Sequence, residues 1–332
     1  MNKYDVAVLG SGPAGLTAAI YLSRGGFKAL VLAGDQPGGQ LTLATDVENY
    51  PGFESISGGK LMDRMQHQAE KFGAKIIIDS AMSIKQATRK FLVKTRNKKE
   101  YSAKALVVAT GASARWLDAP GAGKFKGKGI SACAVCDGPF FRNKIVAVIG
   151  GGNAALIEAE FLARLAQKVY LIHRRESYRA EKILQDRILK NKKITPLFNS
   201  QVKEFLGEEK LAALLLETSF RMEGDRRAQE VAMYPQKYGK IDSQNNEKMI
   251  WRLALDGVFI AIGHKPNTDF LKGFIELDEK GYVKTQSEVF ASVKGVFSAG
   301  DCVDWQYRQA ITAAGMGCKA AIETVEYLKS KN

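Results

Sequence analysis

Two cysteines separated by two residues are the feature of the sequence most suggestive of chemistry. Cys133 and Cys136 form a Cys-x-x-Cys pair, and Asp137 follows directly. Such a pair can supply half of a zinc site, close a small redox-active disulfide, or arise by coincidence. A structural zinc site needs four ligands. The other candidates are single residues without paired spacing, so no metal site is expected: Cys302, Cys318, His67, His173 and His264.

A glycine-rich pattern occurs twice, far apart in the chain. Residues 6–15 read VAVLGSGPAG and residues 146–155 read VAVIGGGNAA. Each copy begins with a β-branched run and continues into an Ala/Leu-rich helical pattern, and a second apolar run follows at 29–32 or 169–172. The order predicts strand, turn, helix and strand, twice. We therefore expect an α/β protein with two Rossmann-like nucleotide-binding domains.

The spacing of the small residues explains what the two turns could bind. The first small residue allows a tight turn, the second lets backbone approach a pyrophosphate, and the third lets helix and strand pack closely. The N-terminus of each helix would present free N–H groups to the phosphates. These parts fall to Gly10, Gly12 and Gly15 in the first copy and to Gly150, Gly152 and Ala155 in the second.

The residues beyond each second strand suggest which dinucleotides bind. In the first copy, the second strand ends at Ala33 and Gly34, and Asp35 is the nearest acid that could contact a ribose. In the second copy, the second strand leads into His173-Arg174-Arg175, with Arg179 four residues later. Guanidinium groups match a 2′-phosphate in charge and shape, so NADPH is the favoured second ligand. With two dinucleotide sites in one chain, dithiol redox chemistry is the favoured interpretation of Cys133 and Cys136.

Composition and charge exclude several classes of function. The chain has 332 residues, 45% of them hydrophobic and 25% charged, which are globular values. No apolar run approaches the roughly 18 residues of a membrane-spanning helix. A strand-like run starts at Tyr4, which leaves no room for a secretory leader, and four cysteines cannot form a disulfide scaffold. A cytoplasmic protein without membrane attachment is expected.

The net charge of +14 is concentrated in one segment. Residues 81–132 carry twelve basic and two acidic side chains, and Lys124, Lys126 and Lys128 precede the cysteine pair. A nucleic-acid interface would add interleaved aromatics or a docking motif, which this segment lacks. Nucleic-acid binding is therefore not expected. An acidic protein partner fits the charge better, because complementary fields raise association rates.

Nearly the whole chain resembles the low-molecular-weight, bacterial-type thioredoxin reductases of the class II pyridine nucleotide-disulfide oxidoreductases. The combination of motifs is specific, above all the Cys-x-x-Cys-Asp placed just before the second nucleotide motif. The motifs are GSGPAG at 10–15, GGQL at 38–41, VENYPG at 47–52, ATGA at 109–112, CAVCDG at 133–138, HRR at 173–175 with RA at 179–180, AIGH at 261–264 with PNT at 266–268, and GD at 300–301 with YRQA at 307–310.

This resemblance implies a domain order and two cofactor sites. An NADPH domain, residues 117–248, would be inserted between two parts of an FAD domain, residues 1–116 and 249–332. The resemblance places FAD on Gly10, Gly12, Pro13, Ala14, Gly15, Ala33, Gly34, Asp35, Gly38, Gly39, Gln40, Asn49, Thr110, Gly111, Gly300, Asp301, Arg308, Gln309 and Ala310. It places NADPH on Gly150, Gly152, Asn153, Ala154, Ala155, His173, Arg174, Arg175 and Arg179.

The resemblance also implies an activity and partners. Electrons would pass from NADPH through FAD to a Cys133–Cys136 disulfide and on to oxidised thioredoxin, in support of thiol homeostasis and removal of reactive oxygen species. Cys136 would be the flavin-side sulfur, Cys133 would attack thioredoxin, and Asp137 would handle the proton. A homodimer is implied as well. Cys302 and Cys318 are expected to be ordinary buried residues.

The sequence departs from the family pattern at several positions. Pro139 precedes Phe140 and Phe141, which alters the expected docking surface, and Asn153-Ala154 is expected to lack one pyrophosphate contact. Residues from about 220 to 245 form an extra polar stretch, for which a solvated loop is the simplest expectation. The alternatives are a reductase of another disulfide protein and a redox sensor that holds FAD and NADPH without turnover.

Overall fold

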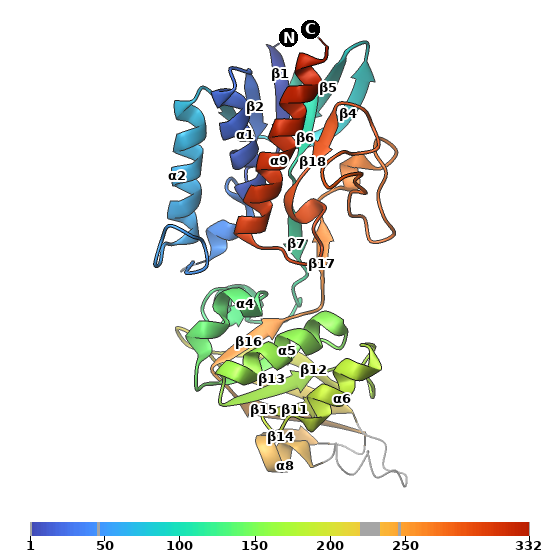
Figure 1. Ribbon diagram of the computed structural model, residues 1–332. Helices are drawn as coiled ribbons and strands as arrows, with labels where there is room; N and C mark the ends of the chain where they lie inside the picture. Colours follow the sequence, from blue (N-terminus) through green and yellow to red (C-terminus); the bar gives the residue numbers. More distant parts are fainter. Residues whose placement is uncertain (1, 45–46, 220–232, 245–246, 332) are drawn as a thin grey trace. The chain divides into compact units, whose positions relative to one another are not determined.

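The protein consists of two compact units, and the second is inserted into the first. The computed structural model describes residues 2–44, 47–219, 233–244 and 247–331. Residues 1–113 and 264–332 form the first unit, and residues 114–263 form the second (Figure 1). The chain thus crosses between the units near 113–114 and 263–264. The strands at these crossings, β7 (Ala112–Ala114) and β17 (His264–Pro266), pair with each other.

These crossings differ from the boundaries expected from the sequence at 116–117 and 248–249. The second difference is the larger one. β15 (Lys248–Ala254) pairs with β13 (Leu211–Ser219), and β16 (Gly257–Ile260) pairs with β9 (Ile145–Ile149), all within the second unit. Hydrogen bonds in these sheets therefore keep the segment up to 263 in the inserted unit.

The first unit is built on a mostly parallel sheet. Its strand order is β3-β2-β1-β6-β5-β4, with β18 beside β6. β1, β2, β3, β6 and β18 run parallel, whereas β4 and β5 continue the sheet as an antiparallel hairpin. The strands are β1 (Asn2–Leu9), β2 (Ala29–Leu32), β3 (Lys75–Ile77), β4 (Ala81–Ala87), β5 (Lys90–Thr95), β6 (Glu100–Val108) and β18 (Val296–Ser298).

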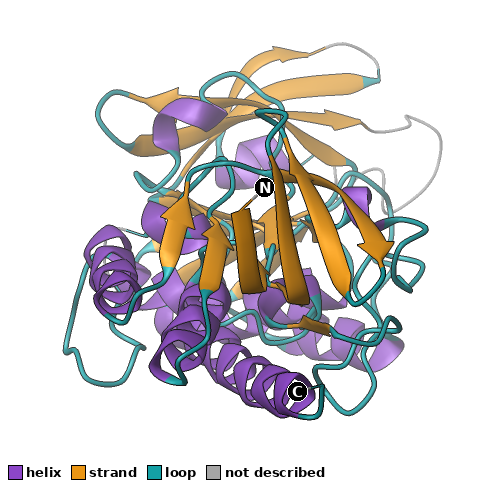
Figure 2. Cartoon of the chain, turned by 90° about the horizontal axis from the view of Figure 1, so that it is seen from above, coloured by secondary structure: helices purple, strands orange, loops and turns teal. Residues whose placement is uncertain are grey.

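Alternation along the strands of this sheet creates two cores. Val6 and Val8 belong to the core under three helices, whereas Ala7 and Leu9 belong to the core on the opposite face. The helices are α1 (Pro13–Arg24), α2 (Gly58–Lys71) and α9 (Ala310–Lys329), and α1 lies between the other two (Figure 1). In Figure 2, α9, which leads to the C-terminus, lies on one side of the front strands. The arrangement matches the expected layered nucleotide-binding fold.

The second unit is also built on a parallel sheet, and a separate antiparallel sheet takes the place of the β4–β5 hairpin. A parallel sheet has the order β11-β10-β9-β16-β8, and an antiparallel sheet has the order β12-β13-β15-β14. Val146 and Val148 face a core with the helices, and Ala147 and Ile149 face a core with the antiparallel sheet. The remaining elements are α3 (Ala122–Phe125), β8 (Ile130–Ser131), α4 (Ala134–Asp137), α5 (Asn153–Leu165), β10 (Lys168–Ile172), α6 (Lys182–Lys190), β11 (Ile194–Leu197), β12 (Ser200–Gly207), α8 (Tyr234–Tyr238) and β14 (Lys240–Gln244).

The structure describes residues 233–244 of the extra polar stretch. Residues 220–232 and 245–246, including Met222, lie outside the described residues. The expectation of a solvated loop is wrong for 234–244, which forms α8 and β14. Tyr234 and Tyr238 lie four residues apart on α8 and pack against the core of the second unit, and β14 pairs with β15. Tertiary pairing supplies the order that polar composition does not suggest.

Within the part of the chain that the structure describes, no helix has both the length and the apolar character that crossing a membrane requires.

Candidate active site

Cys133 and Cys136 are joined by a disulfide at the start of the short helix α4. Their Cα atoms are 5.3 Å apart, a normal spacing for a disulfide. The Cys136 N–H donates to the Cys133 sulfur at 3.2 Å, and the Asp137 N–H donates to the Cys133 carbonyl at 3.1 Å. Ser131, at the end of β8, accepts the Cys133 N–H at 3.0 Å through its hydroxyl. The turn therefore holds both sulfurs in place, and both cysteines are only half-buried.

Asp137 is held in a setting that favours its neutral form. Burial raises the pKa of its carboxyl group above the ordinary value, and a hydrogen bond from the Ser131 side chain opposes part of that shift. A carboxyl group with a raised pKa, next in sequence to Cys136, holds its proton more tightly than an exposed carboxyl group and is suited to proton transfer. Ser131, which contacts both Cys133 and Asp137, was not found from the sequence because no spacing rule connects it to the pair.

The apolar residues around the disulfide divide into an exposed and a packed set. Val135 and Phe140 are exposed, at 50% and 38% of their full accessible area. Phe141 instead packs edge-on against Phe259, with ring centroids 5.3 Å apart, and fills the space beside Gly257. Of the two aromatic residues after the cysteine pair, Phe140 is therefore exposed and Phe141 packs against the core.

The second glycine turn has the geometry expected of a dinucleotide loop. A Cβ on Gly150 would lie 2.5 Å from the Ala261 carbonyl oxygen and 2.6 Å from the Ala155 Cβ, so only glycine fits. A Cβ on Gly152 would meet no protein atom within 4 Å. Gly152 precedes α5 without a side-chain cap, so the N–H groups of the first turn have no side chain covering them. The loop offers both space and donors to a phosphate.

The arginine segment, residues 173–181, begins immediately after β10. His173 is buried, with its ring against Gly151, and burial lowers its pKa, which favours the neutral imidazole. Its Nε2 has no hydrogen-bond partner among the described residues, which leaves a buried polar atom beside the loop. The side chains of Arg174, Arg175 and Arg179 are exposed. The predicted NADPH residues thus come together on one loop and the segment next to it.

The first glycine turn shows the same construction in the first unit. A Cβ on Gly10 would lie 2.1 Å from the Ala109 carbonyl oxygen, and one on Gly15 would lie 2.0 Å from the Gly10 carbonyl oxygen. These contacts confirm the close turn and close helix packing that the spacing predicts. A Cβ on Gly12 would meet nothing within 4 Å, and no side chain caps α1, which starts at Pro13 and Ala14.

Ser11 fastens a second loop to this turn. Its hydroxyl donates to the Ala33 carbonyl at 2.9 Å and accepts the Gly38 N–H at 2.9 Å. The following residue, Gly39, approaches the Gly12 backbone, since a Cβ there would lie 3.5 Å from the Gly12 Cα. The loop from 33 to 39 is therefore held along the first glycine turn. Ser11 was not among the expected site residues.

Two of the expected FAD residues in this region are tied to other groups. Asp35 accepts hydrogen bonds from the Ser80 hydroxyl at 2.7 Å and from Arg96 at 2.6 Å. Gln40 donates to the Gln36 side chain at 3.5 Å, and both are exposed. The side chains of Asp35 and Gln40 therefore contact other protein side chains, whereas the backbone of the 33–39 loop approaches the glycine turn.

The segment before α9 completes the first site. Gly300 packs against Ala14, because a Cβ there would lie 2.9 Å from the Ala14 Cβ. Asp301 is half-buried, and burial together with Asp304 raises its pKa to about 6, while Arg308 acts in the opposite direction. Gln309 precedes the first helical residue, Ala310.

Polar contacts tie this segment to parts of the chain that are distant in sequence. The Asn49 amide donates to the Gln309 side chain at 3.4 Å, across 260 residues. The 110–111 turn is held by Asn267, which donates to the Thr110 carbonyl at 3.0 Å and, through its backbone N–H, to the Gly111 carbonyl at 3.0 Å. Folding therefore brings the expected FAD residues into one unit.

His264 is a further residue of this region that the sequence did not single out as a site residue. It pairs through Nδ1 with a guanidinium nitrogen of Arg308. Arg308 adopts a positive φ of 50°, and Asp304 accepts its backbone N–H at 3.3 Å. Burial and the neighbouring Arg308 lower the pKa of His264 to about 4. Because arginine can only donate, the imidazole is neutral and Nδ1 is the acceptor.

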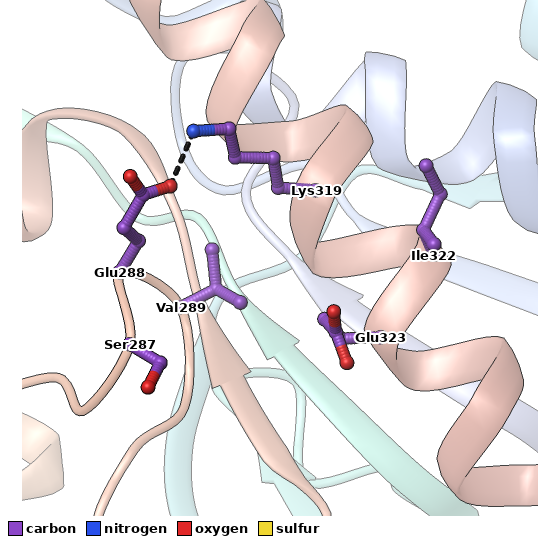
Figure 3. Close-up of a pocket in the computed structure, with 6 residues that line it drawn as sticks. All are labelled: Ser287, Glu288, Val289, Lys319, Ile322 and Glu323. Atoms are coloured by element: carbon purple, nitrogen blue, oxygen red, sulfur yellow. Dashed lines mark hydrogen bonds and ion pairs between the residues drawn. The ribbon is translucent and has the colours of Figure 1, made fainter.

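The remaining cysteines and a small surface cavity lie outside these sites. Cys302 is buried, and burial raises the pKa of its thiol to about 11, whereas Cys318 is half-buried rather than buried as expected. A cavity of about 200 Å³ lies between α9 and the preceding 287–289 turn (Figure 3). Lys319, which lines it, is already paired with Glu288. None of the lining residues belongs to either glycine loop: Ser287, Glu288, Val289, Lys319, Ile322 and Glu323.

Two glycine turns, each between a strand and a helix, and a Cys-x-x-Cys disulfide in one chain are typical of the pyridine nucleotide-disulphide oxidoreductases, and the chain belongs to that family. The family model matches residues 4–317. FAD and NADPH are the cofactors of the protein, in agreement with the cofactors expected from the sequence.

Relatives narrow the similarity further. A thioredoxin reductase of Rickettsia conorii is 45% identical over 97% of both chains. The crystal structure of thioredoxin reductase from Streptococcus pyogenes is 36% identical, covers 99% of each chain and has a TM-score of 0.87. A Pseudomonas fluorescens protein named glucosaminate ammonia-lyase is 43% identical over 97% of this chain and 95% of its own.

Proposed function

We propose that the protein is a thioredoxin reductase that carries electrons from NADPH through FAD and the Cys133–Cys136 disulfide to oxidised thioredoxin. The observation that carries this proposal is the half-exposed Cys133–Cys136 disulfide, in the same unit as a glycine loop flanked by three arginines. A structural disulfide needs neither an adjacent carboxyl group with a raised pKa nor a nucleotide site beside it. The similarity to thioredoxin reductases supports the same partner.

The first unit is the proposed FAD site. The uncapped start of α1 and the open Gly12 would receive the pyrophosphate, and the 33–39 backbone would run along the adenosine side. The Asp301 carboxylate would accept hydroxyl hydrogen bonds. FAD, when bound, supplies a two-electron carrier between the nicotinamide and the disulfide.

The second unit is the proposed NADPH site and also carries the disulfide. Gly150 and Gly152 would face the pyrophosphate, and Arg174, Arg175 and Arg179 would surround the 2′-phosphate. The unpartnered His173 Nε2 would accept a hydrogen bond from the nucleotide. The nicotinamide and the disulfide both have to exchange electrons with the one flavin, so we expect them to reach it in alternation, through a rotation of the inserted unit.

The cysteines then act in a balanced exchange. Two electrons and two protons convert the disulfide into two thiols. Cys133, as the thiolate, attacks one sulfur of the thioredoxin disulfide and forms a mixed disulfide, and the leaving thioredoxin sulfur takes a proton. Cys136 then attacks the Cys133 sulfur, which releases dithiol thioredoxin and restores the Cys133–Cys136 disulfide. Asp137 holds and returns the proton at these sulfurs.

The surroundings of the disulfide suit a protein substrate. Val135 and Phe140 present exposed apolar surface, and the preceding segment carries Lys124 and Lys126. Apolar contacts with a basic rim would fit an acidic thioredoxin. We also propose a homodimer in the cytoplasm, supported by the family resemblance; sedimentation at micromolar concentration tests the dimer.

The decisive experiment is NADPH oxidation by the FAD-loaded protein with oxidised thioredoxin as acceptor. Wild-type protein is expected to turn over steadily, whereas C133S and C136S should keep NADPH-dependent bleaching of the flavin and lose thioredoxin reduction. NADPH should exceed NADH in kcat/KM, and R175A should narrow that difference. Bleaching without turnover would favour a redox sensor, and turnover only with another disulfide protein would replace the partner. Release of ammonia from glucosaminate would indicate the activity named for the P. fluorescens relative.

A further inference from the structure

The arginine segment is fastened to the second glycine loop by three hydrogen bonds. The Arg179 N–H donates to the Gly151 carbonyl at 2.7 Å. The Glu181 N–H donates to Asn153 Oδ1 at 2.9 Å, and Asn153 Nδ2 donates to Glu181 Oε1 at 2.8 Å. The partners fix the orientation of the amide, because a backbone N–H can only donate and a carboxylate can only accept. Asn153 and Glu181 therefore form a reciprocal pair across 28 residues.

This pair joins the starts of two helices. Asn153 is the first residue of α5, and Glu181 immediately precedes α6. Between β10 and α6 the chain has no regular structure, and the arginines that it carries are exposed. Burial of Tyr178 and Ala180 holds this segment from beneath. The bonds of Asn153 fix its position along the glycine loop.

The position of the arginine segment determines how well its arginines can bind a phosphate group. Guanidinium groups bind phosphate through paired, directional hydrogen bonds, so a small displacement of their backbone weakens the contact. A segment already held in the binding geometry loses less conformational freedom when the ligand binds. Asn153 was expected to contact the nucleotide itself. In the structure one end of its amide accepts from Glu181 and the other end donates to it.

We propose that Asn153 and Glu181 are positioning residues that hold the arginine segment against the glycine loop and thereby set the preference for a nucleotide with a 2′-phosphate. This inference rests on the proposed NADPH site and adds to it two residues that determine specificity without touching the 2′-phosphate. The pair acts on the 2′-phosphate end of the nucleotide. Its loss is therefore expected to affect 2′,5′-ADP and leave 5′-AMP, which has no 2′-phosphate, little changed.

Binding of 2′,5′-ADP and 5′-AMP to the FAD-loaded protein, measured by calorimetry, tests the pair. N153A removes both side-chain bonds and should weaken 2′,5′-ADP about tenfold, with less than a twofold change for 5′-AMP. In steady state, KM for NADPH should rise with kcat unchanged. Equal weakening of both ligands, or no weakening, would overturn the proposal. Circular dichroism and the melting temperature show that each variant is folded.

A charge-swapped double variant separates positioning from simple loss of structure. N153D places a carboxylate opposite Glu181 and should lower the 2′,5′-ADP to 5′-AMP affinity ratio. E181Q alone keeps an acceptor for the Asn153 amide and should stay near the wild-type ratio. N153D/E181Q restores a donor and an acceptor with reversed roles and should recover the ratio. If the double variant does not recover the affinity ratio, the proposed positioning role of Asn153 and Glu181 is wrong.

The wild-type protein and R175A keep this test distinct from a test of the NADPH site. A wild-type protein that does not prefer 2′,5′-ADP over 5′-AMP overturns the site and the pair together. If the wild type prefers 2′,5′-ADP, and R175A reduces this preference but N153A does not, the positioning role of Asn153 and Glu181 is wrong and the proposed NADPH site stands.

Discussion

The backbone N–H of Cys136 donates to the sulfur of Cys133 at 3.2 Å. The disulfide is therefore asymmetric, because the two sulfurs do not receive equivalent hydrogen bonds from the turn. After reduction the same N–H would stabilise a thiolate on Cys133, since a hydrogen bond to an ionised group is about twice as strong as one to a neutral group. This asymmetry agrees with Cys133 as the residue that attacks the substrate.

We predict that the reduced protein is alkylated first at Cys133. With limiting iodoacetamide at pH 7, Cys133 should react about tenfold faster than Cys136, because only the thiolate is nucleophilic. Peptide mass mapping after partial labelling measures the ratio, and the unfolded reduced chain, in which the turn is lost, supplies the control. Preferential labelling of Cys136 would reverse the assigned roles.

Asp137→Asn tests the proton carrier. The kcat for thioredoxin reduction should fall about 100-fold, since general acid–base catalysis contributes on that order. Bleaching of the flavin by NADPH should keep its wild-type rate because it involves neither sulfur. Stopped-flow absorbance separates the two steps. A loss shared equally by both steps would indicate a structural role for Asp137.

The same substitution has a predictable effect on stability. Because burial raises the pKa of Asp137, the folded state holds its proton more tightly than the unfolded state does. The wild type therefore loses stability as pH rises from the unfolded pKa of 3.8 through the raised folded value. The variant lacks this loss. Its melting temperature should exceed that of the wild type at pH 8, and the difference should shrink towards pH 4.

The sequence predicted the two tight glycine turns well because local contacts enforce them. A Cβ would lie 2.1 Å from a carbonyl oxygen at Gly10 and 2.5 Å from one at Gly150. The packing therefore requires glycine at both positions, and the spacing of small residues in the sequence shows where the turns lie. The paired strands and helices follow from the same local pattern. A periodic apolar run and a glycine turn are sufficient to predict the element order.

The residues that the sequence did not reveal act through contacts between distant segments. Ser11, Ser131 and His264 hold loops or site residues through hydrogen bonds to groups that no motif links to them. The second domain boundary was misplaced for the same reason, because the pairing of β15 and β16 with other strands of the second unit is a tertiary property. Polar positioning residues have no periodicity, so a sequence alone does not reveal them.

Asp301 predicts a pH dependence for cofactor binding. Its pKa is about 6 in the protein without ligand, and hydroxyl groups of FAD would donate to the ionised form. FAD affinity should therefore rise as pH increases through 6, by about tenfold between pH 5 and pH 7, where the ionised fraction changes by that factor. Fluorescence titration of the apoprotein with FAD measures it. Asp301→Asn should bind more weakly and show a flat profile, whereas an unchanged slope in this variant would assign the dependence to another group.

Phe140 and Phe141 form a matched pair of neighbouring aromatics with different roles. Phe140→Ala should raise KM for thioredoxin about tenfold with little change in melting temperature, because exposed aromatics commonly act as binding anchors. Phe141→Ala removes the packing on Phe259 and should cost about 3 kcal/mol of stability. Thioredoxin kinetics and thermal unfolding of both variants separate the effects. The opposite assignment of KM and stability effects would place Phe141 at the interface.

The clustered positive charge predicts salt-dependent recognition of an acidic thioredoxin. Lys124 donates to the Gly207 carbonyl at 3.2 Å, and Lys126 lies 4.2 Å from the centroid of the Trp116 ring, so both charges are held at the surface of the second unit. Because exposed charges are screened over about 10 Å at 0.1 M salt, kcat/KM should fall several-fold between 50 and 300 mM salt.

A triple lysine-to-glutamine variant locates this effect. K124Q/K126Q/K128Q should lower kcat/KM at 50 mM salt about fivefold and flatten the salt profile, because its effect is on the association rate. The matched control, K85Q/K90Q/K94Q, removes the same charge from the β4–β5 hairpin of the first unit, where all three lysines are exposed. That control should keep the wild-type slope. Equal slopes in the two triple variants would show that net charge, rather than this cluster, attracts thioredoxin.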